Sequence, residues 1–225
     1  MAQGVDAEQV VPVEPRDAAS VLLLRQGAQT PLEVFVMRRR TSMAFAGGVV
    51  AFPGGGVSVE DSSPVDPVWV DRLGAADAAQ AAGVVGAAVR ELVEETGVVL
   101  TSDALGAWDA WTTPITEPRR YRTWFFTARL PEGQEALELS TESSSVEWIA
   151  PSEALDRADR REWAVMPPTY ASLLRLATFG SVEEALASTA TAALQMFTPV
   201  VSAEGIRLPA WAGELAATRA EAIWR

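Results

Sequence analysis

The feature that most constrains the fold of this chain is an alanine-rich segment over residues 75–96. Its apolar and charged side chains separate at a period of about 3.6 residues, which predicts a single amphipathic helix. Glu91, Glu94 and Glu95 fall within about 100° of one another on one face. The opposite face carries an aliphatic stripe made of Val85, Val89, Leu92 and Val93. The helix must therefore bury one face against another layer and leave three carboxylates on the other.

Apolar runs of strand length lie before and after this helix. They cover residues 19–25, 32–38, 47–56, 121–129 and 146–150, and the third run leads into a glycine loop. Residues 57–74 contain Pro, Asp and Ser without a clear period, so we predict an irregular insert there. This order of elements predicts an α/β sandwich followed by helices.

The pattern becomes helical after Pro151. Residues 151–158 begin with Ser152 as the expected N-cap, residues 167–179 begin with two prolines, and residues 181–190 predict a third short helix. We predict three regions: a lead-in over residues 1–17, a main domain over residues 18–160, and a helical extension over residues 161–225 that packs on the main domain.

Three absent residue types narrow the chemistry. The chain contains no Cys, no His and no Lys. Thiolate nucleophiles, Ser-His-Asp triads, imidazole metal ligands, Schiff bases and the lysine of a phosphate-binding loop are therefore excluded. Carboxylates and Arg must carry any catalysis, and carboxylate oxygens favour Mg²⁺ or Mn²⁺ over zinc.

Charge and hydropathy limit which partners the protein can have and where in the cell it is expected. A net charge of −12 argues against a nucleic-acid polymer as a partner, whereas a small phosphate compound can bind if a metal screens its charge. No apolar run reaches the length of a membrane span, and the first 15 residues lack the basic start of a secretory signal. We therefore expect a cytoplasmic protein without membrane contact. The Ala-rich, Lys-free composition is typical of bacteria with GC-rich genomes, and a homodimer stays open.

The glutamate face has two interpretations. Glu-rich helix faces are common, and taken alone this one favours an ordinary solvated surface. Three like charges on one face weaken a helix, and a divalent cation bound to them would reverse that effect. The surrounding residues favour the second interpretation.

Residues 90–98, RELVEETGV, resemble the second half of the Nudix box, GX5EX7REUXEEXGU, in which U is aliphatic. Every fixed position of that half is filled, and Phe52-Pro53-Gly54-Gly55 resembles the FPGG turn that opens the box. The resemblance implies a Nudix α/β/α sandwich with a mixed β-sheet, plus C-terminal helices. It also implies hydrolysis of a diphosphate linkage in a nucleoside diphosphate derivative, with Mg²⁺ or Mn²⁺ as cofactor.

The box is interrupted. Its first Glu would fall at Asp61, and 28 residues separate Asp61 from Arg90, which is 21 more than the seven that the box allows. We place the insert at about residues 62–82. A longer loop costs little closure entropy, so the insert affects loop shape and substrate choice more than metal binding. In the family the first Glu braces the Arg of the box, and Asp61 is expected to brace Arg90 in the same way.

The resemblance assigns roles to individual residues. The catalytic group is Arg90, Glu91, Glu94 and Glu95. The expected metal ligands are those three glutamates, the carbonyl of Gly54 and one carboxylate from outside the helix, for which we choose Glu142 ahead of Trp148. Glu138 and Glu147 are the alternatives, and a loop acid in water explains Glu142 equally well. Phe52 and Gly55 are expected to contact substrate, and Asp61 and Gly97 to have structural roles, with Gly97 ending the helix.

Further segments resemble the branch of the family that includes acyl-coenzyme A diphosphatases. These segments are the insert itself, AFPGGGVSVEDSS at residues 51–63 and VMPPTYASLLRL at residues 165–176. The upstream coenzyme A signature of the family is only partly present, because Arg39 and Gly48 match it while Arg40 and Ala44 do not.

Substrate contacts and substrate class stay open. Arg38, Arg39 and Arg40 are candidates for binding a 3′-phosphate, with a solvated strand end as the alternative; Arg119, Arg120 and Arg122 form a second arginine group. Trp108, Trp111 and Trp124 could stack on a base, although core positions are more common for such residues. Besides coenzyme A or acyl-CoA, the alternatives are a nucleotide diphosphatase for NADH or ADP-ribose, and a catalytically weak Nudix-fold binding module.

Overall fold

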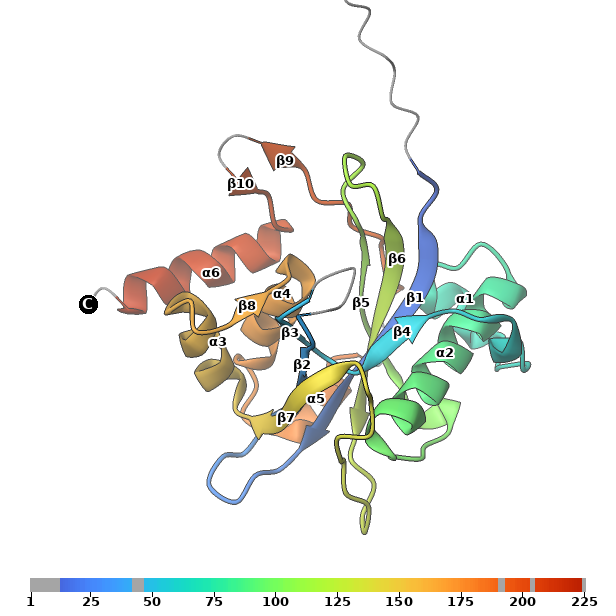
Figure 1. The fold of residues 1–225 in the computed structure, drawn as a ribbon, viewed down its shortest axis with the longest axis horizontal. Helices are drawn as coiled ribbons and strands as arrows, with labels where there is room; N and C mark the ends of the chain where they lie inside the picture. Colours follow the sequence, from blue (N-terminus) through green and yellow to red (C-terminus); the bar gives the residue numbers. More distant parts are fainter. Residues whose placement is uncertain (1–12, 42–46, 190–192, 203–204, 224–225) are drawn as a thin grey trace, which may run out of the picture.

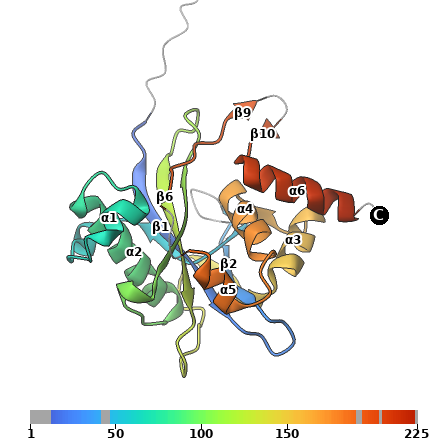
Figure 2. The same cartoon turned by 180° about the vertical axis from the view of Figure 1, so that it is seen from behind.

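The computed structural model describes residues 13–41, 47–189, 193–202 and 205–223 of the chain. Ala44, which departs from the coenzyme A signature, therefore lies outside the described residues. The chain folds as an eight-stranded mixed sheet with helices on both of its faces (Figures 1 and 2). The predicted α/β sandwich with a mixed sheet is confirmed.

The sheet has the order β5-β6-β1-β2-β3-β8, with β4 added beside β1 and β7 beside β2. Its strands are β1 Arg16–Arg25, β2 Glu33–Arg39, β3 Val49–Ala51, β4 Gly54–Gly56, β5 Gly106–Thr112, β6 Tyr121–Arg129, β7 Ser143–Ile149 and β8 Ala164–Val165. The β1–β6 and β3–β8 pairs are parallel, and the other pairs are antiparallel. A separate hairpin joins β9 Val201–Ser202 to β10 Gly205–Ile206.

The centre of the sheet is forked. Strands β1 and β2 pair only at one end, through Leu24 with Val34 and Arg25 with Glu33. Toward its start, β1 pairs with β4 instead, while β2 pairs with β3 and β7. The two halves of the sheet therefore separate, and a cavity opens between them.

Strand β1 is buried on both faces, because its residues alternate between two hydrophobic cores. Val21 and Leu23 face the core beneath α1 Val68–Leu73 and α2 Ala78–Thr96. Leu22 and Leu24 face the other core. That second core is covered by the later helices: α3 Pro151–Asp159, α4 Pro167–Leu176, α5 Val182–Ala187 and α6 Ala210–Ile223 (Figures 1 and 2). No helix within the described ranges is both long and apolar enough to span a bilayer.

Helix α2 ends at Gly97, as its sequence predicts, but begins at Ala78 rather than at the predicted Ala75. The Asp77 carboxylate caps its start by accepting the Gln80 N–H at 2.8 Å. Gly97 ends it in the left-handed conformation, with φ of 76° and its N–H bonded to the Val93 carbonyl at 2.9 Å. Leu92 and Val85 are buried, as the aliphatic stripe predicts.

Several sequence-based expectations for the elements were wrong. The insert is not irregular throughout, since it contains α1 and, just before it, the 3₁₀ turn η1 Val59–Asp61. The glycine loop is the strand β4, and the strand β5 was not predicted at all. Ser152 does not cap α3, because Ala150 is the N-cap and Pro151 occupies the first turn. Strand β1 begins at Arg16, inside the predicted lead-in.

Candidate active site

Arg90 on α2 organises the acidic residues of the box. Its guanidinium donates to both carboxylate oxygens of Asp61 at 2.9 Å, and only 2% of the Asp61 side chain is exposed. Its Nη1 also donates to Glu91 at 2.8 Å and to Glu94 at 3.2 Å. The hydrogen bond that Arg90 donates to Asp61 foremost, and then the one to Glu91, raise the pKa of Arg90, so the residue stays a fixed cation.

Asp61 is also held from its own side. It lies at the end of η1 and accepts the Ser58 N–H at 2.7 Å. Gly86 of α2 packs directly on it, because a Cβ at that glycine would lie 2.4 Å from the Asp61 carbonyl oxygen. The helix thus approaches η1 closely enough for Asp61 and Arg90 to meet, despite the 28 residues between them.

The FPGG turn brings β4 against the glutamate face. The Pro53 carbonyl accepts the Val21 N–H at 2.8 Å and the Ser20 hydroxyl at 3.1 Å, which fixes the turn to β1. At Gly54, with φ of 155°, a Cβ would lie 2.2 Å from the Ala19 carbonyl oxygen. At Gly55 a Cβ would lie 2.2 Å from a carboxylate oxygen of Glu91. The two glycines therefore allow the backbone and the carboxylates to come together.

Glu95 is the most buried of the three glutamates, at 7% exposure. It accepts the Gly54 N–H at 2.7 Å. Burial raises the pKa of Glu95 to about 7, against the effect of this hydrogen bond, and the neighbouring Glu91 adds to the rise. Burial also raises the pKa of Glu91, opposed by its contact with Arg90.

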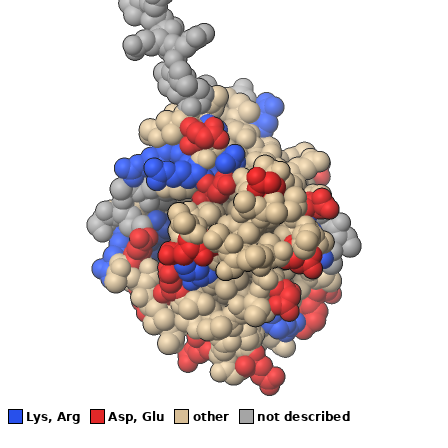
Figure 3. Space-filling view, turned by 90° about the vertical axis from the view of Figure 1, so that its right-hand side faces the viewer, with Lys and Arg blue, Asp and Glu red and all other residues tan. Residues whose placement is uncertain are grey.

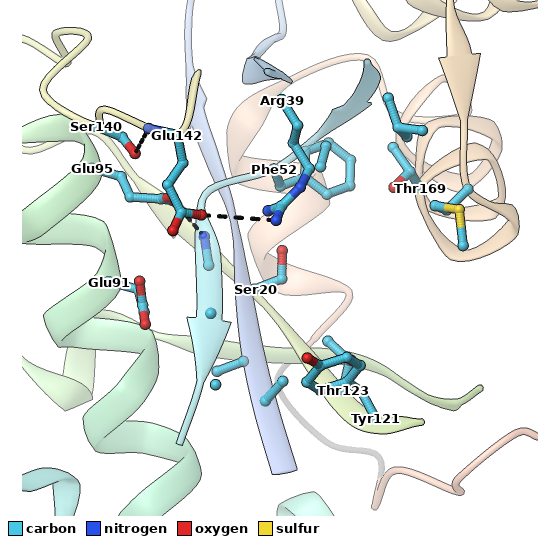
Figure 4. A pocket seen from close by; sticks show the side chains of 18 of the residues that line it. Ser20, Arg39, Phe52, Glu91, Glu95, Tyr121, Thr123, Ser140, Glu142 and Thr169 are labelled. Carbon is cyan, nitrogen blue, oxygen red and sulfur yellow. Dashed lines mark hydrogen bonds and ion pairs between the residues drawn. The ribbon is translucent and has the colours of Figure 1, made fainter. Parts of the chain in front are cut away.

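The glutamate face forms one wall of a cavity of about 720 Å³. The fork of the sheet supplies the floor, and the start of α4 lies opposite α2 (Figure 4). The predicted site residues that line this cavity are Arg39, Phe52, Gly54, Gly55, Glu91, Glu94, Glu95 and Glu142. Three other predicted site residues do not line it: Asp61 and Arg90, which pair with each other, and Gly97, which ends α2.

Glu142 reaches the cavity from the loop before β7. Figure 4 shows its carboxylate between the side chains of Glu95 and Arg39, and it is 3.8 Å from an Arg39 Nη atom. Glu138 and Glu147, the alternatives, do not line the cavity. Glu138 accepts the Ser143 hydroxyl, and Glu147 pairs with Arg157 at 3.0 Å.

The three consecutive arginines at the end of β2 point in different directions. Arg39 enters the cavity, and its Nε atom is buried without a hydrogen-bond partner among the described residues. Arg38 donates to the Glu162 carbonyl at 3.2 Å and Arg40 to the Ser143 carbonyl at 2.7 Å. The structure therefore does not bring Arg38 and Arg40 to the cavity. Alternation along a strand sends neighbouring side chains to opposite faces.

The aromatic candidates belong to the cores. Trp108, Trp111 and Trp124 are at most 3% exposed, and none lines the cavity. Their indole N–H groups donate inside the protein, to Ser172, Asp109 and the Leu73 carbonyl respectively. Phe52 is 4% exposed and forms part of the cavity wall.

Sequence reasoning missed much of the rest of the cavity. Figure 4 shows that the cavity is also faced by Ser20 of β1, by Tyr121 and Thr123 of β6, and by Thr169 of α4. Arg119, which the sequence analysis named in the second arginine group, also lines it. These residues come from three separate parts of the chain, and only the fork of the sheet brings them together. For Thr169, the similarity of residues 165–176 to a known branch was the one available signal.

The residues fit a divalent metal by donor type. Four carboxylates, from Glu91, Glu94, Glu95 and Glu142, line one cavity, and oxygen donors suit Mg²⁺ or Mn²⁺. In the described part of the chain, however, no group of three or more acids is already arranged to hold an ion. Glu91 and Glu94 each turn one oxygen to Arg90, and Glu95 turns one to Gly54. To share a metal, the carboxylates must turn their remaining oxygens toward one point.

Comparison with known families and structures identifies one relationship. Residues 73–171 match the NUDIX domain family. A solved structure, the NUDIX hydrolase from Alicyclobacillus acidocaldarius, superposes with a TM-score of 0.66 at 25% identity, over 77% of this chain and 96% of that one.

Two sequence relatives carry related names. "Putative nudix hydrolase 7" of Caenorhabditis elegans is 29% identical over 197 residues, which are 72% of this chain and 60% of that protein. An acyl-coenzyme A diphosphatase of Homo sapiens is 34% identical over 83 residues, which are 36% of this chain and 22% of the human protein. The chain thus spans less than two thirds of either relative.

Proposed function

We propose that this chain, which contains a Nudix domain, is a metal-dependent hydrolase of a diphosphate linkage in a nucleoside diphosphate derivative. One observation carries the proposal. Arg90, braced by the buried Asp61, holds Glu91 and Glu94 at the wall of a cavity into which Glu95 and Glu142 also project. The glycines of β4 let its backbone lie directly against Glu91 and β1, which keeps the carboxylate at the wall of the cavity.

Glu91, Glu94 and Glu95 would hold the divalent ion, with Glu142 and the Gly54 carbonyl completing the set of oxygen ligands. A bound ion of this kind neutralises the diphosphate and lowers the pKa of an attacking water. The protein itself positions the reactants. Arg39, which lines the cavity with an Nη atom 3.8 Å from Glu142, would donate to a non-bridging phosphate oxygen, and a cavity carboxylate would accept the proton of the water.

For the substrate we propose coenzyme A or acyl-CoA. The name of the human relative supports this choice over the part of the chain that it matches. The cavity of about 720 Å³ lies within the range of about 300–1,000 Å³ that sites for drug-sized molecules span. Met166, Pro168 and Phe125 give it a partly apolar wall. NADH and ADP-ribose are the competing substrates.

A panel of diphosphate compounds tests this proposal. The purified protein is incubated with Mg²⁺ or Mn²⁺ and with coenzyme A, acetyl-CoA, dephospho-coenzyme A, NADH or ADP-ribose, and the products are separated by chromatography. We expect coenzyme A to yield adenosine 3′,5′-bisphosphate and phosphopantetheine. Preferred cleavage of NADH or ADP-ribose would replace the substrate proposal while leaving the reaction class intact.

A Nudix-fold binding module is the second candidate. It is favoured by the present arrangement of the carboxylates, which contact Arg90 and Gly54 rather than converging on one point. If no compound of the panel is cleaved with either metal, but one binds in calorimetry, this second function replaces the first.

A further inference from the structure

A second hollow adjoins the candidate active site. Its volume is about 370 Å³, and it lies between the start of β1 and the segment that leads into β6. Arg119 and Tyr121 line both this hollow and the main cavity, so the two spaces lie next to each other.

The hollow is cationic in a strongly acidic protein. Among the described residues, three arginines line it, Arg16, Arg119 and Arg120, together with one carboxylate, that of Glu14. Glu14 pairs with Arg122 at 3.6 Å, and Asp17 also pairs with Arg122, at 2.6 Å. In the described ranges, neither Arg16 nor Arg120 has an ion-pair partner. Figure 3 shows arginine side chains gathered near the point where the chain enters β1.

One of these arginines is already held in place. The Arg120 guanidinium donates from Nε to the Thr113 carbonyl at 3.2 Å and from Nη1 to the Val13 carbonyl at 2.9 Å. Both acceptors are neutral, so the positive charge is fixed in position without being cancelled. A preorganised guanidinium of this kind loses little freedom when it binds an anion.

The hollow is remote from the end of the cavity where Arg39 lies. In Figure 4, Tyr121 and Thr123 stand at the opposite end from Arg39 and Glu142, with Glu91 between the two ends. An anion bound beyond Tyr121 is therefore a group other than the diphosphate held at the glutamates.

We infer that Arg16, Arg119 and Arg120 form a subsite for a phosphomonoester that the substrate carries in addition to its diphosphate. The inference rests on the proposed function and narrows its substrate class to phosphorylated nucleoside diphosphate compounds. Guanidinium groups suit phosphate oxygens, and a dianionic phosphate needs more than one of them. The consecutive Arg38 and Arg40 do not provide such a subsite, because both donate to backbone carbonyls outside the cavity.

Substrates that differ only in this phosphate test the inference. The ratio of kcat/KM for coenzyme A over dephospho-coenzyme A is measured for the parent, for the double variant Arg16→Gln/Arg119→Gln, and for the control Arg161→Gln. Arg161 is an exposed arginine that lines neither hollow. We expect the double variant to lower the ratio by about ten- to a hundred-fold, as for lost charge-assisted hydrogen bonds, and the control to leave it unchanged. The pair NADPH and NADH distinguishes a 2′-phosphate from a 3′-phosphate.

Binding of the product half separates this inference from the proposed function. Adenosine 3′,5′-bisphosphate should bind more tightly than AMP in calorimetry, and the double variant should remove that difference even if the protein hydrolyses nothing. Loss of turnover with this binding pattern intact would overturn the proposed function alone. Equal kcat/KM for both members of each substrate pair, together with equal binding of the bisphosphate and AMP, would overturn the subsite.

Discussion

At the scale of single residues, the site depends on one buried ion pair. Asp61 is nearly inaccessible to solvent, and Arg90 is the cation that compensates its charge. The pairing of these two residues followed from their positions in the box, although the shorter Asp replaces Glu. The sequence could not indicate how the pair is supported, because Gly86 and the Ser58 N–H act through backbone geometry.

The variant Arg90→Ala should destabilise the fold. It leaves the buried Asp61 carboxylate without its partner, which typically costs about 3–5 kcal/mol. The free energy of unfolding, measured by chemical denaturation, checks this value. Arg160→Ala removes an exposed pair with Glu162 and serves as the control, with an expected change below about 1 kcal/mol. Equal effects of the two substitutions would show that Asp61 does not depend on Arg90.

The variant Gly55→Ala should impair activity, because its Cβ would lie 2.2 Å from a Glu91 carboxylate oxygen and would displace that side chain. Misplacement of a catalytic group by about 1 Å can lower the rate by about a hundred-fold. The neighbouring Gly56→Ala is the matched control, since the nearest atom to its Cβ would be 4.0 Å away. Steady-state kinetics should show a much lower rate for Gly55→Ala than for Gly56→Ala. Similar rates for the two variants would contradict a catalytic role of Glu91.

At the scale of elements, the hydrophobic period and the residues at the ends of a segment were sufficient to predict the type of the long helices and strands. Helix α2, the strand β6 and the start of α4 agree with their sequence patterns because each alternates or repeats over enough residues. Strand β5 was missed since it is buried on both faces and carries Asp109 in its middle, which hides the alternation. Helix α1 has only six residues and follows a proline-rich stretch, too short for a visible helical period.

Because α2 and η1 are in close contact, we expect a substitution in α2 to have an effect on stability opposite to the one that helix propensity predicts. Gly86→Ala should destabilise the protein although Ala is the better helix former, because the new Cβ would lie 2.4 Å from the Asp61 carbonyl oxygen. Forcing atoms into such a contact costs about 1–3 kcal/mol. Gly213→Ala in α6, where nothing lies within 4 Å of the Cβ, should instead stabilise by up to about 1 kcal/mol. Thermal denaturation of the two variants should show shifts of opposite sign, and a stabilised Gly86→Ala would contradict the close approach.

At the scale of the whole molecule, the forked sheet creates the site. Local patterns predicted the α/β class, the strands on either side of α2 and the helices after Pro151. They could not predict that β1 leaves β2 to pair with β4, nor that Tyr121, Thr169 and Arg39 meet in one cavity. These are long-range pairings, which a single sequence does not encode in any local period. The candidate metal ligands could be predicted from the sequence only because three of them lie within five consecutive residues of one helix.

The central claim, that the glutamates of α2 carry metal-dependent hydrolysis, is tested most directly by the turnover of Glu95→Gln at saturating Mg²⁺ or Mn²⁺. We expect a loss of at least about a hundred-fold, because a ligand that stabilises charge in the transition state is removed. Stability should be unchanged or higher, since burial already raises the pKa of Glu95 and disfavours its charged form. The control Glu138→Gln, whose side chain does not line the cavity, should keep parental turnover. Near-parental turnover of a folded Glu95→Gln would contradict the claim.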